Sequence, residues 1–187
     1  MRALVLALTV LLGFSGTAAR AESIDIGPAV GTAIPMPFAV HDSQGALQTF
    51  ADLAGPSGAV LVFVRSASWC PYCIQQLRDI ESVNAELKTR GYRLVSVSYD
   101  TPDILTAFAK KFGVTYTMTS DEGSKMIDAF KIRDPQYPAT SRAYGVPKPA
   151  IFVVDKGGIV RAKLAEEGYK TRPPSAAIIS AIDSLKK

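Results

Sequence analysis

The stretch AVLVFVRSASWCPYCIQQL, residues 59–77, decides the fold of this chain. Its first part, 59–65, is a continuous apolar run rich in valine, typical of a strand covered on both faces. A loop then leads to Cys70 and Cys73, the only two cysteines among 187 residues. Pro71 favours the first turn of a helix, so Cys70 falls at the cap of a helix that begins here. The stretch therefore predicts a buried strand, a short loop and a helix that starts at the thiols.

Apolar residues continue beyond the thiols at spacings of three and four, which marks one face of a continuous helix. These positions are Cys73, Leu77, Ile80, Val83 and Leu87. The pattern places Cys73 on the inner face, turned toward the core. Cys70, at the mouth of the helix, is expected to be open to solvent.

The rest of the chain alternates strands and helices, which indicates an α/β domain. Two further apolar runs, 93–100 and 150–155, are expected beside the first strand, and the glycines at 157–158 predict a hairpin turn after the last one. Helices are expected after Thr101, after the Ser-Asp-Glu sequence 120–122, and after the Pro-Pro-Ser sequence 173–175. The segment 134–145 is expected to be an irregular excursion over the surface.

The first 21 residues have the pattern of a secretory signal peptide. An arginine stands near the start, an apolar run follows, and small residues end at Ala21, after which we expect the cut. The apolar run is shorter than the roughly 20 residues that a membrane anchor needs. We therefore expect a periplasmic protein with no stable membrane anchor. In such an oxidising compartment disulfides persist.

Residues 22–35 read as a surface lead-in and residues 36–187 as a single domain. Removing Arg2 and Arg20 with the signal peptide leaves 19 basic against 17 acidic residues, a formal charge of +2. The lysines are spread along the chain. This balance predicts neither nucleic-acid binding nor a basic membrane-binding surface.

A pair of thiols at a helix N-terminus is suited to redox chemistry. Unpaired N–H groups there stabilise a thiolate and lower the pKa of the first thiol. Cys70 is thus the expected attacking thiol and Cys73 the resolving one, through a Cys70–Cys73 disulfide. A purely structural disulfide would stabilise little, because the loop it closes is short. Zinc needs about four ligands, and two cysteines with His41, the only histidine, do not supply them.

Residues around the thiols are candidates for substrate binding. Trp69 can pack on the end of the strand and also present a flat surface to a partner. Tyr72, between the thiols, can change their reduction potential. His41 is expected to be a solvated turn residue. Pro149 directly precedes a central strand, and from the residues alone an ordinary trans proline is favoured there over a cis one.

The sequence FVRSASWCPYC, with VPKPAIFVVDKGG further on, resembles the thioredoxin-fold superfamily. More narrowly it is similar to the redoxin branch, which includes alkyl hydroperoxide reductase/thiol-specific antioxidant and peroxiredoxin-like proteins, over about residues 36–185. The resemblance implies a thioredoxin-like fold, a central mixed β-sheet with helices on both faces. It also implies a cis Lys148–Pro149 bond facing the thiols, with Trp69, Pro71, Tyr72, Lys148 and Pro149 as substrate-binding residues.

The chain also departs from this branch. A typical peroxidase site reads P-x-x-x-T-x-x-C and is completed by an arginine from a later strand. Counting back from either cysteine finds neither the proline nor the threonine, and Pro149 stands where the arginine is expected. Arg65 is a candidate to replace it. These departures favour dithiol–disulfide exchange over peroxide reduction.

Three functions are therefore weighed. The first is an exported thiol–disulfide oxidoreductase acting on protein or small-thiol substrates, without a cofactor or metal. The second is a peroxiredoxin-like thiol peroxidase, and the third a non-enzymatic module with a structural disulfide. The expected partners are a protein disulfide or dithiol and a membrane or periplasmic electron donor.

Overall fold

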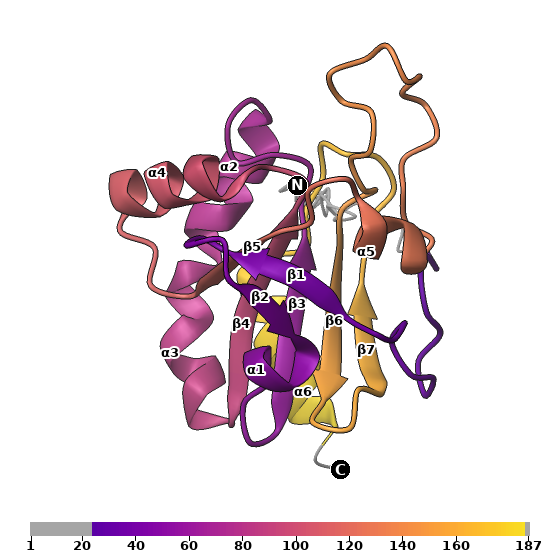
Figure 1. Cartoon of the computed structure of the whole chain (residues 1–187). Coiled ribbons are helices and arrows are strands. Elements are labelled where there is room, and N and C mark those ends of the chain that lie inside the picture. The colour runs from indigo at the N-terminus through magenta and orange to yellow at the C-terminus, as the bar shows by residue number, and fades with distance from the viewer. Residues whose placement is uncertain (1–23, 186–187) are drawn as a thin grey trace, which may run out of the picture.

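The computed structural model describes residues 24–185 and shows a seven-stranded mixed sheet with helices on both faces (Figure 1). The strands are β1 (Ala39–Asp42), β2 (Leu47–Thr49), β3 (Gly58–Phe63), β4 (Tyr92–Ser98), β5 (Thr117–Ser120), β6 (Ala150–Asp155) and β7 (Val160–Leu164). The helices are α1 (Phe50–Leu53), α2 (Pro71–Asp79), α3 (Glu81–Thr89), α4 (Pro102–Phe112), α5 (Lys125–Ala129) and α6 (Ser175–Ser184). Within residues 24–185, no helix has the length and apolar character needed to cross a bilayer.

The strand order is β2-β1-β5-β4-β3-β6-β7. Strand β3 pairs parallel with β4 and antiparallel with β6, which confirms that the three apolar runs lie side by side. The hairpin expected at 157–158 joins β6 to β7. The predicted α/β class is therefore confirmed, and the sheet is mixed.

Both faces of β3 are buried, because alternate side chains enter two different cores. Val60 and Val62 pack with residues of α2, α3, α4 and α6. Ala59, Leu61 and Phe63 pack with residues of α1 and α5 on the opposite face. This double coverage is what the continuous apolar run predicts.

The prediction of one continuous helix from Cys73 to Leu87 is wrong in its continuity. The chain forms two helices, α2 and α3, separated at Ile80. The hydroxyl of Ser82 donates to the carbonyl of Asp79 at 2.6 Å, so a side chain takes over a backbone acceptor at the break. The prediction that these apolar residues form the inner face is confirmed, because all of them are buried despite the interruption.

The N-terminal lead-in belongs to the packed body. Its described part, 24–35, runs beside β7, where the N–H of Gly31 donates to Val160 at 2.8 Å. Ile34 is buried in the core on that face. The predicted signal peptide, with its cut after Ala21, lies outside the described residues.

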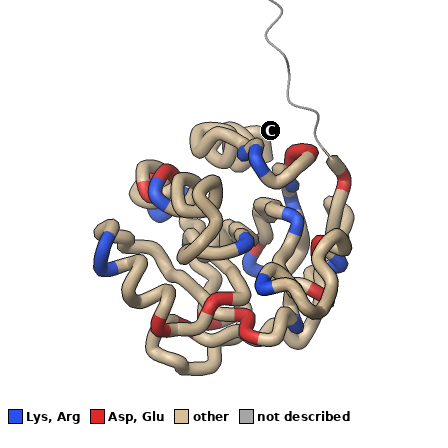
Figure 2. Tube along the Cα trace, turned by 90° about the horizontal axis from the view of Figure 1, so that it is seen from above, with Lys and Arg blue, Asp and Glu red and all other residues tan. Residues whose placement is uncertain are grey.

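Basic and acidic positions are interspersed along the chain when the molecule is seen from above (Figure 2). The segment between α5 and β6, which includes 134–145, extends from the body as an irregular excursion (Figure 1). That excursion matches the prediction and supplies part of the site.

Candidate active site

The two cysteines lie at the N-terminus of α2 and form a disulfide. Cys70 is the N-cap residue and Pro71 occupies the first turn, as the sequence predicts. The Cα atoms of Cys70 and Cys73 are 5.2 Å apart. The N–H groups of Cys73 and Ile74 both donate to the Cys70 carbonyl, at 3.0 and 2.9 Å. The first turn of the helix thus brings the two sulfurs together.

The expected solvent exposure of Cys70 is wrong. Cys70 is 1% exposed and Cys73 is 0% exposed, and both belong to the core cluster that Ala67 and Leu77 share. The sequence pattern gave the position of Cys70 on the helix correctly but not the segments that cover it. Those segments come from elsewhere in the chain, so local periodicity could not reveal them.

The loop before Cys70 is held by a buried carboxylate. Asp100, at the end of β4, accepts hydrogen bonds from the hydroxyl of Ser66 (2.7 Å), the N–H of Ala67 (2.7 Å) and the hydroxyl of Ser98 (2.9 Å). Burial raises the pKa of Asp100, and these hydrogen bonds oppose that rise. The carboxylate therefore fixes the path from β3 to the thiols.

Arg65, three positions before Ser68 in the same loop, lies buried among aromatic rings. Its guanidinium carbon is 4.2 Å from the ring centre of Tyr169, 4.9 Å from Tyr137 and 5.3 Å from Trp69. One guanidinium nitrogen donates to the Tyr137 hydroxyl. Arg65 is 3% exposed, and its Nε has no hydrogen-bond partner among the described residues. The ring faces stabilise this cation in place of an acidic partner.

A second arginine, Arg172, contacts the sulfur of Cys73 directly. Arg172 Nη2 lies 3.5 Å from Cys73 Sγ, and Arg172 Nε donates to Gln76 Oε1 at 2.8 Å. Burial, with the like charge of Arg65, lowers the pKa of Arg172 to about 10, and Glu166 acts in the opposite direction. Arg172 therefore remains a cation at neutral pH, beside Cys73.

Trp69 is fixed by polar groups rather than left as a free surface. Its Nε1 donates to the Tyr99 hydroxyl at 2.9 Å, and that hydroxyl donates to the Arg142 carbonyl at 2.7 Å. The guanidinium of Arg142 also lies 5.1 Å from the centre of the Trp69 ring. Tyr72 is more open, at 39% exposed, and packs against the Tyr169 ring in a T-shaped arrangement.

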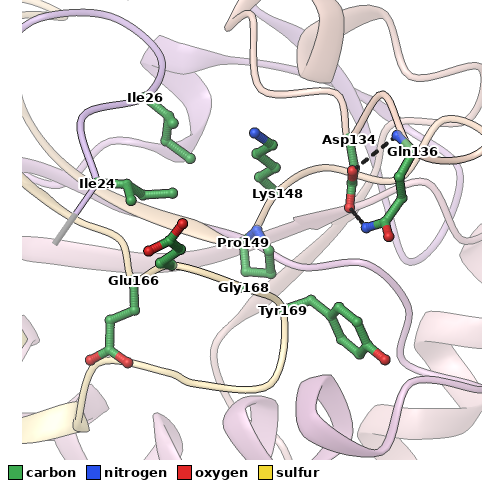
Figure 3. A pocket seen from close by; sticks show the side chains of 10 residues that line it. Ile24, Ile26, Asp134, Gln136, Lys148, Pro149, Glu166, Gly168 and Tyr169 are labelled. Atoms are coloured by element: carbon green, nitrogen blue, oxygen red, sulfur yellow. Dashed lines mark hydrogen bonds between the residues drawn. The ribbon is translucent and has the colours of Figure 1, made fainter. Parts of the chain in front are cut away.

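Lys148 and Pro149 line a pocket of about 440 Å³ together with the 166–169 segment (Figure 3). Since Ala150 pairs with Phe63, they lie at the same end of the sheet as the loop that carries Arg65. Figure 3 also shows Asp134, which accepts a hydrogen bond from the Gln136 side chain at 2.6 Å. This pocket brings two of the predicted binding residues to Tyr169, which contacts Tyr72.

The prediction of a cis Lys148–Pro149 bond, which the family resemblance implied, is wrong. Among the described residues, the cis bond lies at Met36–Pro37, and Pro149 follows a trans bond into β6. Trans is the preferred form of an X-Pro bond by about 0.5–1 kcal/mol. Here it carries the chain directly from Lys148, whose N–H donates to Ile132, into the extended strand.

His41 was expected in a solvated turn but lies in β1, paired with Leu47 and exposed. Several residues of the site were not identified from the sequence: Gln76, Asp100, Tyr137, Tyr169 and Arg172. Gln76 had an available signal, because it lies three positions after Cys73 and therefore on the same helix face. The others come from distant segments. Tyr169 and Arg172 lie in the stretch 168–173, which also resembles the redoxin branch, but nothing in the sequence placed it beside the thiols.

A cysteine pair at the N-terminus of a helix that follows the central strand of a mixed sheet defines a thioredoxin-like redox protein. A model of the AhpC/TSA family matches residues 30–163. This match spans more than half of the chain, so the chain belongs to the AhpC/TSA family, whose members are redox enzymes. The redoxin resemblance seen in the sequence is thereby confirmed.

Individual relatives agree with this membership. The chain is 28% identical over 128 residues to peroxiredoxin Q from Sedum lineare, covering 68% of this chain and 64% of that protein. It is 27% identical over 97 residues to the thiol-disulfide oxidoreductase ResA of Halalkalibacterium halodurans, covering 51% and 53%. The structure of peroxidoxin BcpB from Mycobacterium tuberculosis superposes with a TM-score of 0.70 at 19% identity, covering 87% of this chain and 97% of that one. This last likeness confirms the thioredoxin-like fold.

Proposed function

We propose that this chain is a thiol peroxidase that reduces hydroperoxides through the Cys70–Cys73 pair. The observation that carries the proposal is the complete burial of both sulfurs beside the cation of Arg172. A hydroperoxide is small enough to reach a buried sulfur in the closed site, whereas a protein partner, including the dithiol that later reduces the disulfide, requires the covering segments to move aside. The peroxiredoxin Q relatives support the same choice.

The reaction balances with the two cysteines and one reductant. A cysteine thiolate attacks one peroxide oxygen, a sulfur–oxygen bond forms, and the O–O bond breaks. The leaving alkoxide takes a proton and departs as an alcohol, or as water when the substrate is hydrogen peroxide. The other thiol then attacks the sulfenic sulfur, forming the Cys70–Cys73 disulfide and releasing water. An external dithiol restores both thiols by accepting the disulfide bond.

The arginines suit this chemistry because negative charge develops on the leaving oxygen as the O–O bond breaks. Preorganised donors in a site closed to water stabilise such charge more strongly than water does. Arg172 is held in position by Gln76, and Arg65 is held by its ring contacts. Neither guanidinium has to reorganise when the substrate arrives.

Dithiol–disulfide exchange with a protein substrate is the second candidate. The C-x-x-C spacing and the absence of the P-x-x-x-T-x-x-C pattern favour it, and so does the similarity to ResA. It requires Tyr72 and the 166–173 segment to move aside so that a partner can reach Cys70.

Rapid mixing of the reduced protein with hydrogen peroxide and with an organic hydroperoxide separates the two. A peroxidase should consume peroxide roughly 10²–10³-fold faster than free cysteine thiolate, because of its preorganised donors. Consumption at the rate of free cysteine, together with efficient reduction of insulin disulfides, would replace the peroxidase with the exchange enzyme. The double variant Cys70→Ser/Cys73→Ser is the matched control for both assays.

We also propose that the protein is exported to the periplasm and receives electrons there from a dithiol protein. The signal-like pattern of residues 1–21 supports export. Expression of the full chain in a diderm bacterium should yield a periplasmic product that begins at Glu22, measured by intact mass. A cytoplasmic product that keeps residues 1–21 would contradict the proposal.

A further inference from the structure

We propose that Arg172 stabilises the thiolate of Cys73 in the reduced protein, and that Cys73 is the sulfur that attacks the substrate. This assignment rests on the proposed function for the identity of the substrate. It reverses the order expected from the sequence, in which Cys70 attacks and Cys73 resolves.

The position of Arg172 is fixed by three hydrogen bonds from two of its nitrogen atoms. Its Nε donates to Gln76 Oε1, and its Nη1 donates to the carbonyls of Thr171 (2.8 Å) and Tyr169. These contacts leave Nη2 directed at Cys73 Sγ, 3.5 Å away. Gln76 is itself buried on α2, one turn after Cys73, so one helix face carries both the sulfur and the group that orients its cation.

The two sulfurs differ in this respect. Cys70 is the N-cap residue, yet its side chain makes no capping hydrogen bond to the first turn of α2. Cys70 lies instead in the apolar cluster with Ala67. Both sulfurs share the positive end of the helix, so the contact with Arg172 decides which one ionises more readily.

Charge balance gives a second reason. Arg65 and Arg172 repel each other, and neither forms a salt bridge to an acidic side chain among residues 24–185. The acidic groups of this region are Glu166, which acts on Arg172, Asp100, which is engaged with the loop before Cys70, and Asp134 and Glu167, which line the pocket with Tyr169. Asp134 accepts a hydrogen bond from Gln136. In the disulfide state the sulfurs carry no charge. Reduction supplies the missing anion, so the dithiol state gains an interaction that the disulfide lacks.

The consequence for the reaction is a defined order of steps. The Cys73 thiolate attacks the peroxide oxygen and becomes the sulfenic acid, while the alkoxide leaves and takes up a proton. Cys70 then attacks Cys73, the S–S bond forms, the S–O bond breaks, and water departs. Stabilisation of the reduced form also makes the disulfide more oxidising.

Two single-cysteine variants of the full chain, Cys70→Ser and Cys73→Ser, test the assignment. Thiolate absorbance is followed against pH in each. The remaining Cys73 is expected to ionise at the lower pH. In the Cys70→Ser background, Arg172→Gln should raise the apparent pKa of Cys73 by about one unit or more, a tenfold change in its dissociation constant. Arg172→Lys should recover part of the loss.

Arg161→Gln is the matched control, since Arg161 is an exposed arginine bound to Asp155 at the far end of β6. It should leave the titration of Cys73 unchanged. In the two-cysteine protein, Arg172→Gln should shift the equilibrium with glutathione toward the disulfide by about tenfold, or roughly 30 mV. Arg161→Gln should not.

Three results would overturn the inference. The first is a lower pKa for Cys70 than for Cys73. This comparison uses variants that keep Arg172, so it does not depend on whether Arg172→Gln folds. The second is an unchanged Cys73 titration in Arg172→Gln, and the third an equal shift in Arg161→Gln. Because the titrations use no peroxide, an acidic Cys73 without peroxidase activity would reject only the proposed function. Peroxidase turnover started by an acidic Cys70 would reject only this inference.

Discussion

Arg172 and Cys73 are 99 positions apart in the chain, yet a guanidinium nitrogen of the first lies 3.5 Å from the sulfur of the second. The contact joins the segment before α6 to the first turn of α2. A second long-range contact, from the Arg65 guanidinium to the Tyr137 hydroxyl, joins the excursion to the loop before Cys70. The reactive pair is thus enclosed by residues from three distant parts of the sequence.

Gln76→Met should weaken the hold on Arg172 while keeping the volume and the apolar stem of the side chain. A lost hydrogen bond to a charged group costs about 1.5–3 kcal/mol in free energy of unfolding. The same change should raise the apparent pKa of Cys73, by less than Arg172→Gln does. Urea unfolding and thiolate titration measure the two effects. Gln75→Met is the control, since Gln75 is exposed and its side chain donates to Asp79 on the same helix. Equal effects at both positions would contradict the role of Gln76.

Tyr169→Leu should expose the disulfide, because the Tyr169 ring covers Arg65 at 4.2 Å and meets Tyr72. Removal of the ring should cost about 0.5–2 kcal/mol in free energy of unfolding. It should also speed reduction of the disulfide by a small dithiol. Tyr169→Phe keeps the ring and should leave both quantities near those of the parent protein. If Phe and Leu variants are reduced at the same rate, the ring does not shield the sulfurs.

Asp100→Asn should alter the pH dependence of stability. Burial raises the folded-state pKa of Asp100, so its contribution to stability is fully present below the unfolded pKa. That contribution is lost as pH rises through the folded pKa. The asparagine variant has no such loss, so its free energy of unfolding relative to the parent should increase as pH rises from acid toward neutral. A difference that stays constant across this range in urea unfolding would show that burial does not shift Asp100.

Gly58→Ala should be strongly destabilising, because Gly58 has φ of +139° and a Cβ there would collide with the carbonyl of Val154. We expect a loss of about 3 kcal/mol from the close approach of β3 and β6. Gly113→Ala is the matched comparison. Gly113 also has positive φ, at +67°, but a Cβ there meets nothing within 4 Å, so its loss should be about 1–2 kcal/mol. Thermal or urea unfolding of both variants checks the ranking.

Most of the framework was accessible from the sequence, because it depends on short-range patterns. The valine-rich run predicted the doubly covered strand β3, and Pro71 after Cys70 predicted the start of α2. Both are local effects of side-chain pattern and backbone preference. The break at Ile80 was missed because the apolar spacing continues across it, although Ser82 replaces a helical hydrogen bond there.

The environment of the site could not be predicted in the same way. The burial of Cys70 depends on a core cluster that includes residues of distant elements, such as Leu105 and Ile178. The trans bond before Pro149 follows from how Lys148 enters β6, and the family resemblance suggested the opposite. Arg65 was the arginine near the thiols that the sequence offered as a candidate for the peroxidase arginine. Tertiary packing placed it among aromatic rings and brought Arg172 to the sulfur instead.

Trp69 is the single tryptophan of the chain, next to Cys70 and close to the guanidinium groups of Arg65 and Arg142. Indole emission responds to neighbouring charge and to nearby disulfide sulfur. Opening the Cys70–Cys73 bond changes both at once, so the intensity of this intrinsic fluorescence should report the redox state. The unlabelled protein thereby carries an optical signal by which its oxidation and reduction can be followed in real time.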